Sequence, residues 1–272
     1  MRVSVSASRR FDGAEEGRLW GLGAGEEVLV RPPETHMRLR DVMALLKHPT
    51  PEAFYVEYNA AHQYLGERLQ AMAPLPPHPP SLRPLLQNLW LGKGATTSPL
   101  HYDDYENLLT QAAPAPHVPD MRRCTHPSAP PLARLRLRLC VSCRSRLAQV
   151  RGTKRLLLFP PSDLPYLYYT PRVKGTLRYQ WPNNFSRVPP SPAEARRRVV
   201  FGSSVNVSQP DLGRHPLLPR ASPHVCTLRE GETLLLPAFW HHEVHSEATS
   251  AGDVNVAVNF WFRNVRPPPE GF

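Results

Sequence analysis

Residues 98–109 read S-P-L-H-Y-D-D-Y-E-N-L-L and place His101 and Asp103 two positions apart. Alternate residues of a β-strand point to the same face, so an imidazole and a carboxylate at this spacing converge on one point. One more histidine from a distant strand would complete a set of two histidines and one carboxylate, which holds Fe(II) and leaves positions open for other ligands. By itself the H-x-D pattern is common and also fits an ordinary polar pair at a strand edge.

A histidine cluster follows an apolar stretch further along the chain. Residues 231–246 read GETLLLPAFWHHEVHS, so His241, His242 and His245 all compete for the role of the distant histidine. On a strand, His242 would share a face with Trp240, and the other two histidines would lie on the opposite face. The spacing leaves all three open, and a packed, hydrogen-bonded histidine is the ordinary alternative for each.

The rest of the chain reads mainly as short strands. We expect strands at 53–58, 88–92, 100–111, 154–159, 224–228, 231–237, 242–246 and 254–262, and helices at 37–47 and 60–72. The stretch 162–223 is rich in proline and aromatic residues and is predicted to hold only short elements. Many short strands with turn signals between them, and few helices, predict a β-sandwich or barrel.

The domain organisation is predicted from composition. We expect a poorly ordered N-terminus over 1–27 and one domain over 28–272, interrupted by 112–149. That interruption carries seven arginines and one aspartate, and so supplies much of the formal net charge of +10. Residues 108–111 and 150–159 on either side read as halves of one hairpin. We therefore interpret 112–149 as a disordered basic insertion at a hairpin tip, where added length costs little loop-closure entropy.

Bulk properties exclude several classes of protein. The sequence has no run of 18 apolar residues, so it predicts no membrane span. The first residues lack the apolar core of a secretory signal. Four cysteines in 272 residues do not make a disulfide framework. A reducing compartment, the cytoplasm or the nucleus, is therefore expected.

Four motifs in a fixed order resemble the small JmjC hydroxylases. They are SPLHYD at 98–103, GTKRLLLFPP at 152–161, GETLLLPAFWHH at 231–242 and VNFW at 258–261. The similarity covers 88–263. Within the family, the motifs resemble those of factor inhibiting HIF, an asparaginyl hydroxylase, and of the tRNA wybutosine hydroxylase. It implies a mainly β fold, the double-stranded β-helix or jelly-roll of the cupin-like JmjC barrel, with a few N-terminal helices. It also implies Fe(II) and 2-oxoglutarate as cofactors.

The resemblance assigns roles to individual residues. It implies that His101, Asp103 and His242 are the catalytic metal ligands. Lys154 stands where the family has a lysine that binds the far carboxylate of 2-oxoglutarate, and we expect its strand to lie beside the H-x-D strand. The other expected co-substrate residues are Asn107, on the same strand face as His101; Asn259, in the VNFW strand; Ser98, where relatives have a threonine; and Tyr55, by a looser match.

The function implied by the resemblance is an Fe(II)- and 2-oxoglutarate-dependent dioxygenase that hydroxylates a protein side chain. The aromatic stretch 162–223 would then line a groove for a peptide. The alternatives are an RNA-modifying hydroxylase, which would use nucleic acid as substrate, and a non-catalytic cupin-like binding module, which would lack a ligand or the lysine. Relatives dimerise through C-terminal helices that do not follow the last strand here, so we do not expect a homodimer formed by that route.

Overall fold

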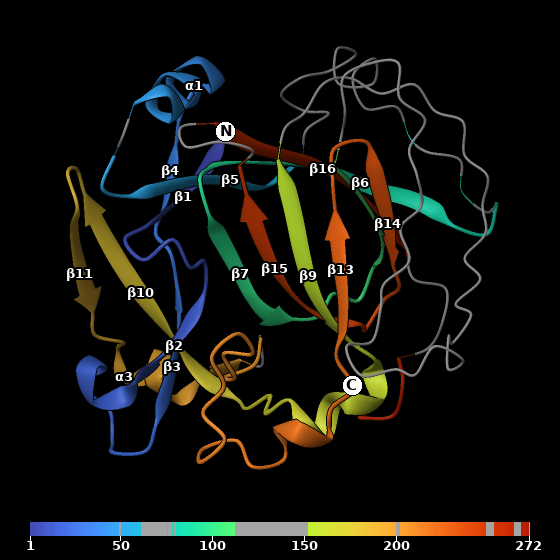
Figure 1. Ribbon diagram of the computed structural model, residues 1–272. Coiled ribbons are helices and arrows are strands. Elements are labelled where there is room, and N and C mark those ends of the chain that lie inside the picture. The colour runs from blue at the N-terminus through green and yellow to red at the C-terminus, as the bar shows by residue number, and fades with distance from the viewer. Residues whose placement is uncertain are drawn as a thin grey trace.

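The computed structural model describes residues 1–48, 50–60, 75, 78, 80–111, 152–199, 202–248, 253–263 and 268–271. Over these residues the chain is mainly β, with three sheets of seven, five and four strands (Figure 1). The first and the third face each other, as the two halves of a jelly-roll do. The mainly β, jelly-roll fold class is confirmed.

The seven-stranded sheet forms one wall of the jelly-roll. Its strand order is β14-β8-β16-β6-β5-β1-β4, and all its pairs are antiparallel. The strands are β1 (Arg2–Ser6), β4 (Glu34–His36), β5 (Ala53–Ala60), β6 (Arg83–Lys93), β8 (Glu106–Gln111), β14 (Glu232–Leu236) and β16 (Val254–Arg263). The longest pairing joins β6, of eleven residues, to β16, of ten, and runs from Val254 opposite Lys93 to Arg263 opposite Arg83.

The four-stranded sheet forms the opposite wall. Its order is β13-β9-β15-β7, again antiparallel throughout. The strands are β7 (Thr96–His101), β9 (Thr153–Phe159), β13 (His224–Leu228) and β15 (His241–Glu247). Apolar side chains from both walls meet between the sheets. Leu156 and Leu158 of β9 pack there with Leu234 and Leu236 of β14 and with Ala257 of β16.

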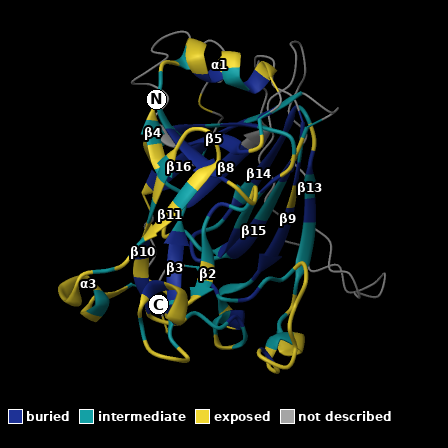
Figure 2. Cartoon of the chain, turned by 90° about the vertical axis from the view of Figure 1, so that its left-hand side faces the viewer, coloured by how far each residue is buried: buried dark blue, intermediate teal, exposed yellow. Residues whose placement is uncertain are grey.

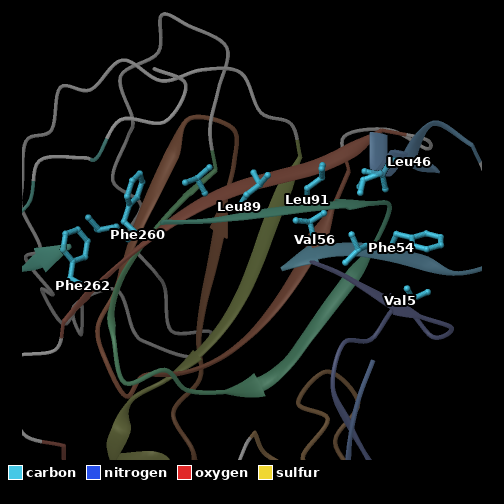
Figure 3. Packing of buried hydrophobic residues seen from close by; sticks show 12 residues of the cluster. Val5, Leu46, Phe54, Val56, Leu89, Leu91, Phe260 and Phe262 are labelled. Atoms are coloured by element: carbon cyan, nitrogen blue, oxygen red, sulfur yellow. The ribbon is translucent and has the colours of Figure 1, made fainter. Parts of the chain in front are cut away.

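The outer face of the seven-stranded sheet carries a second apolar cluster. Phe54, Val56, Leu89, Leu91 and Phe260 are buried there (Figure 3). Helix α1 (Leu39–Lys47) covers this face with Val42 and Leu46, and its exposed residues point away from the sheet (Figure 2). The large sheet is therefore covered on both faces, which explains why neighbouring residues of one strand are both apolar.

The five-stranded sheet lies beside the jelly-roll (Figure 1). It has the order β11-β10-β3-β2, with β12 also paired to β10. Its strands are β2 (Gly13–Glu16), β3 (Glu27–Arg31), β10 (Arg172–Gln180), β11 (Asn184–Val188) and β12 (Arg198–Val199). The remaining helices are short: η1 (Gly17–Trp20), η2 (Pro161–Tyr166), α3 (Pro192–Arg196) and η3 (Leu218–Arg220). Among the described residues, no helix has the length and apolar character to cross a membrane.

Two expectations about strand pairing were wrong. Residues 100–111 are not one strand, because β7 ends at His101 and β8 begins at Glu106 in the other sheet. Strands β8 and β9 are likewise not a hairpin: β8 pairs with β14 and β16, whereas β9 pairs with β13 and β15. The physical reason is burial, since Leu108 and Leu109 are both buried on opposite faces of the large sheet. A hairpin edge would leave one of them in water.

The N-terminal segment also differs from expectation. We expected poor order over 1–27, but the structure places β1, β2 and η1 there. Val3 and Val5 alternate with serines, and both pack in the outer cluster of the large sheet. The alternation is too short to stand out in the sequence, and its partner strands β4 and β5 come later. The expected helix at 60–72 beyond Ala60, and the expected insertion at 112–149, lie outside the described residues.

A buried carboxyl ties β1 to β5. Glu57 accepts a hydrogen bond from the Ser4 hydroxyl, and its exposed fraction is 4%. Burial raises the pKa of Glu57 from its ordinary value to about 7, and the Ser4 hydroxyl opposes that shift. Because the folded pKa lies above the unfolded one, this group favours the folded state less as the pH rises from about 5 to 8.

We therefore predict that Glu57→Gln stabilises the protein at pH 8, on the order of 2 kcal/mol, and has little effect at pH 5. The amide keeps an acceptor for Ser4 but carries no charge. Urea unfolding of the variant and wild type at both pH values measures this. The control is Glu16→Gln, which removes a carboxylate that is 60% exposed, pairs with Arg18 and does not contribute to the pKa shift of Glu57. An equal gain at pH 5 and pH 8 would contradict the titration of Glu57.

Candidate metal centre

Strand β15 lies between the two strands that carry the expected site residues. It pairs with β7 on one side, where His242 lies opposite His101, and with β9 on the other, where Ser246 lies opposite Lys154. Backbone hydrogen bonds therefore fix which residues face one another. The expectation that the strand of Lys154 lies beside the H-x-D strand was wrong, because β15 separates the two.

An irregularity in β7 turns the expected residues inward. Ser98 pairs with Val244 and His101 with His242, so three steps along β7 match two along β15. The extra residue lies at Pro99–Leu100, and proline, which has no N–H to donate, is tolerated at such bulges. The bulge shifts the alternation by one. Thr97 and Leu100 consequently contact residues on the outer face, which leaves Ser98 and His101 on the inner face.

His101, Asp103 and His242 come together at the end of β7 and the start of β15. Each offers one ligand atom, and these atoms all lie within 4.8 Å of one another. The His101 and His242 rings have centroids 4.2 Å apart, and His242 Nε2 lies 3.8 Å from Asp103 Oδ2. Asp103 lies just beyond the strand rather than on it, and its carbonyl accepts a hydrogen bond from the Phe239 N–H at 2.8 Å. That bond joins the loop after β7 to the turn before β15.

The hydrogen bonds of the two histidines suit metal binding. His101 Nδ1 lies 2.7 Å from the Pro99 carbonyl oxygen, and His242 Nδ1 lies 3.0 Å from that of Trp240. A carbonyl only accepts, so each Nδ1 carries a proton, and each Nε2 is left as the nitrogen that a metal would bind. This is the arrangement found in metal-ligating histidines, whose other nitrogen donates to a carbonyl or carboxylate.

The electrostatics of the three side chains also fit a cation. Burial, and then the nearby charge of His101, lower the pKa of His242 to about 3, so its imidazole is neutral at pH 7. Burial raises the pKa of the Asp103 carboxyl, while His101 acts in the opposite direction. A divalent cation would offset the desolvation of the carboxylate and needs neutral imidazoles as ligands. The donor set therefore fits a divalent metal ion.

The other two histidines of the cluster point away from this centre. His241 is fully buried, and its Nδ1 lies 3.0 Å from the Tyr169 hydroxyl. His245 Nε2 lies 2.9 Å from Glu243 and 3.0 Å from the Ser208 hydroxyl. The geometry thus resolves the three-way choice that the spacing left open, in favour of His242 as the histidine that faces His101.

The lysine expected to bind the co-substrate is buried on the same inner face. Lys154 is 2% exposed, and its ammonium group donates to the Ser246 hydroxyl at 2.6 Å. Burial lowers its pKa to about 7. Tyr55 completes this group: it is hydrogen-bonded to Ser246, and Lys154 Nζ lies 6.0 Å from the centre of its ring. A buried cation with two hydroxyl groups around it is suited to a carboxylate.

Two asparagines face these residues from the large sheet. Asn259 Nδ2 donates to Asn107 Oδ1 at 3.2 Å, and the Trp90 indole donates to Asn259 Oδ1 at 3.0 Å. We expected Asn107 to share a strand with His101. It does not, because the chain passes from one sheet to the other between β7 and β8. Both asparagines are nevertheless buried in the interior between the two walls.

Sequence reasoning missed Ser246 and Trp90, which hold Lys154 and Asn259 in place. Ser246 had a usable signal, since it lies an even number of positions from His242 and so shares its face. Trp90 had none, because its role depends on the pairing of β6 with β16.

The geometry predicts that His242→Ala removes metal binding and that His245→Ala does not. His242 presents a free Nε2 to the centre, whereas His245 is engaged with Glu243 on the opposite face of the strand. Calorimetric titration with Mn(II) should show affinity weakened at least about 100-fold in the first variant, as for loss of one of three ligands, and little changed in the second. Equal losses in the two variants would contradict this choice of ligand.

Comparison with known proteins agrees with the fold. Residues 144–266 match the family model described as a cupin-like domain. Human "bifunctional peptidase and (3S)-lysyl hydroxylase JMJD7" is 30% identical over 175 residues, which cover 64% of this chain and 40% of that protein. The "tRNA wybutosine-synthesizing protein 4" of Aspergillus oryzae is 35% identical over 119 residues, covering 44% of this chain and 8% of that protein.

A third relative gives the same picture. Human "tRNA wybutosine-synthesizing protein 5" is 35% identical over 115 residues, covering 42% of this chain and 26% of that protein. The chain thus spans 40% or less of the length of these three relatives. Together with the two facing antiparallel sheets, these matches show that the chain contains a cupin-like domain of the JmjC type.

Proposed function

We propose that this protein is an Fe(II)- and 2-oxoglutarate-dependent dioxygenase that hydroxylates a protein side chain. One observation carries the proposal: the inner face of β15 joins His242, which faces His101 and Asp103, to Ser246, which holds Lys154. The metal ligands and the buried Lys154 therefore face the same interior, and the two residues of β15 that contact them, His242 and Ser246, are four positions apart. A keto acid with a second carboxylate is the kind of molecule that would contact both.

Each residue has a distinct part in this proposal. His101, Asp103 and His242 would hold the metal by one face. Lys154, with Ser246 and Tyr55, would bind the far carboxylate of 2-oxoglutarate, while Asn107 and Asn259 would contact the co-substrate from the opposite wall. Ser98 would contact the co-substrate from the inner face of β7. It lies between the metal ligands and Thr96, the residue opposite Ser246.

The metal and 2-oxoglutarate, when bound, supply the oxidising chemistry, with dioxygen as oxidant and succinate and carbon dioxide as by-products. The chain contributes orientation and exclusion of water. Leu156 and Leu158 are 0% and 3% exposed, and they border the inner face beside His242 and Val244. A dry apolar wall strengthens the charge interactions of the ligands and of Lys154.

A protein substrate is favoured by the relative whose name includes (3S)-lysyl hydroxylase, which matches the largest share of this chain among the three. An RNA substrate is the second candidate, favoured by the relatives named as tRNA wybutosine-synthesizing proteins. The ligand atoms of His101, Asp103 and His242 lie within 4.8 Å of one another, and Lys154 is buried. That arrangement favours a catalyst over a binding module.

The state of Lys154 predicts how 2-oxoglutarate binding depends on pH. With a pKa of about 7 in the free protein, most of its amine is neutral at pH 8. A bound carboxylate favours the ammonium form, so binding at pH 8 should take up close to one proton, and binding at pH 6 almost none. Calorimetry with Mn(II) in buffers of different ionisation enthalpy measures the uptake.

Lys154→Met should abolish that proton uptake and weaken 2-oxoglutarate binding about 10- to 100-fold, as for loss of a charge-assisted hydrogen bond. The control is Lys93→Met, because Lys93 lies at the end of β6 and donates to the His48 carbonyl. Proton uptake that persists in Lys154→Met would show that another group binds the carboxylate.

Turnover tests the function itself. The protein with Fe(II), ascorbate, oxygen and 2-oxoglutarate should form succinate, and a lysate of proteins should gain single oxygen atoms that mass spectrometry locates on side chains. Asp103→Ala is the inactive control. Oxygen incorporation into RNA but not protein would establish the second candidate. Tight 2-oxoglutarate binding with no turnover on either would support a binding module.

A further inference from the structure

A pocket of about 470 Å³ lies outside the candidate metal centre. Its walls come from the residues just before and at the start of β3, from the segment 168–172 that leads into β10, and from the stretch 198–215. None of the expected metal or co-substrate residues lines it. Its chemistry is set by Arg172, Arg198, Arg214 and His215, together with two glutamates.

The pocket carries an excess of positive charge. Arg198 pairs with Glu26 at 2.6 Å, and Arg214 pairs with Glu27 at 2.7 Å. Arg172 adds a third guanidinium, so that the lining has three cations against two carboxylates. Each guanidinium has five N–H donors, and the ion pairs of Arg198 and Arg214 use only some of them. Further donors therefore remain to meet a ligand.

The surrounding sequence strengthens this charge. Residues 172–220 include nine Lys or Arg residues but only two acidic ones, Glu194 and Asp211. The basic character of the chain is thus not confined to 112–149, as the composition first suggested. Three of these nine residues, Arg172, Arg198 and Arg214, line the pocket, where they raise the local potential for anions.

Arg172 is a buried cation in the lining of the pocket. The residue is 1% exposed, and its Nη2 donates to the Gly202 carbonyl at 2.6 Å. Burial lowers the pKa of the guanidinium, while Glu27, Tyr169 and Asp12 nearby act in the opposite direction and offset part of the cost of burying the charge. An oxyanion bound in the pocket would add to that compensation. Guanidinium groups match carboxylate and phosphoryl oxygens in a two-pronged geometry.

The pocket adjoins the metal centre through two short connections. The Ser203 N–H donates to the Leu100 carbonyl at 2.7 Å, which places the residue after Gly202 against the residue before His101. On the other side, Tyr168 lines the pocket, and the next residue, Tyr169, contacts His241 beside His242. Tyr168 has a φ of +51°, an uncommon conformation for a bulky residue that is often retained at functional sites.

We propose that this pocket binds an oxyanion group of the protein substrate, a carboxylate or a phosphoryl group, at a position near the hydroxylated residue. The part that concerns the substrate rests on the proposed function. Oxyanion binding by the pocket does not, because none of the metal ligands lines it. Arg172, Arg198 and Arg214 would be the residues that determine this preference.

The test uses the whole chain with EDTA present, so that the metal centre plays no part. Inorganic phosphate and N-acetylglutamate amide are titrated at constant ionic strength, with binding followed by NMR. The double variant R198Q/R214Q removes two of the three cations. Its matched control, R196Q/R197Q, removes two exposed arginines at the end of α3 that do not line the pocket, and so makes the same change in net charge.

We expect saturable binding of at least one probe to the wild type and to R196Q/R197Q, weakened tenfold or more in R198Q/R214Q. Binding of phosphate alone would identify a phosphorylated substrate, and binding of the glutamate probe an acidic one. No saturable binding to the wild type, or equal weakening in the two double variants, would overturn the proposal. Should R198Q/R214Q fail to fold, R214Q alone serves, since the Arg214 side chain is 63% exposed.

If binding occurs, a second measurement connects it to the substrate. For peptides that the wild type hydroxylates, KM should rise fivefold or more in R198Q/R214Q when they carry the oxyanion group, and should be unchanged when they lack it. A protein that binds phosphate in EDTA but forms no succinate would retain the pocket and refute the hydroxylase. The two proposals therefore fail separately.

Discussion

The double pairing of β15 is the constraint on which the rest of the site depends. Its backbone hydrogen bonds to β7 set His242 opposite His101, and those to β9 set Ser246 opposite Lys154. A shift of one residue in either pairing would turn these side chains to the outer face, because strand side chains alternate. Strand β15 therefore holds both ends of the candidate site. The bulge at Pro99–Leu100 keeps Ser98 and His101 of β7 on the same inner face.

The edge of the ligand-bearing sheet is protected by the N-terminal segment. Thr97 of β7 donates its N–H to the Arg9 carbonyl at 3.0 Å and accepts from the Phe11 N–H at 2.8 Å. Arg10 in turn reaches the buried carboxylate of Glu243 at 3.4 Å. Residues far apart in the sequence thus close the open side of β7, which would otherwise present unpaired backbone groups to other chains.

The interior between the sheets combines two environments that oppose each other. Leucines from both walls form a dry cluster, while Lys154, Asn107, Asn259 and His242 are buried within the same layer. Buried polar groups lower stability unless they are hydrogen-bonded, and these side chains have partners such as Ser246 and the Trp240 carbonyl. Retaining these polar groups lowers the stability of the fold, but it places the charges of the site where the dielectric constant is low and their interactions are stronger.

The sequence by itself determined the fold class, most of the strands and the candidate ligands. Period-two alternation and turn residues are local signals, so β9, β13, β14, β15 and β16 were predicted close to their observed bounds. Strand pairing was not predicted as well, since β8 and β9 were assigned to one hairpin but lie in separate sheets. The resemblance of the motifs pointed to His242, and the tertiary structure shows that it is His242, not His241 or His245, that faces His101. Only the tertiary structure revealed Ser246, Trp90 and the arginine pocket. Those relations join residues through register and packing between distant segments, which a single sequence does not encode in any local pattern.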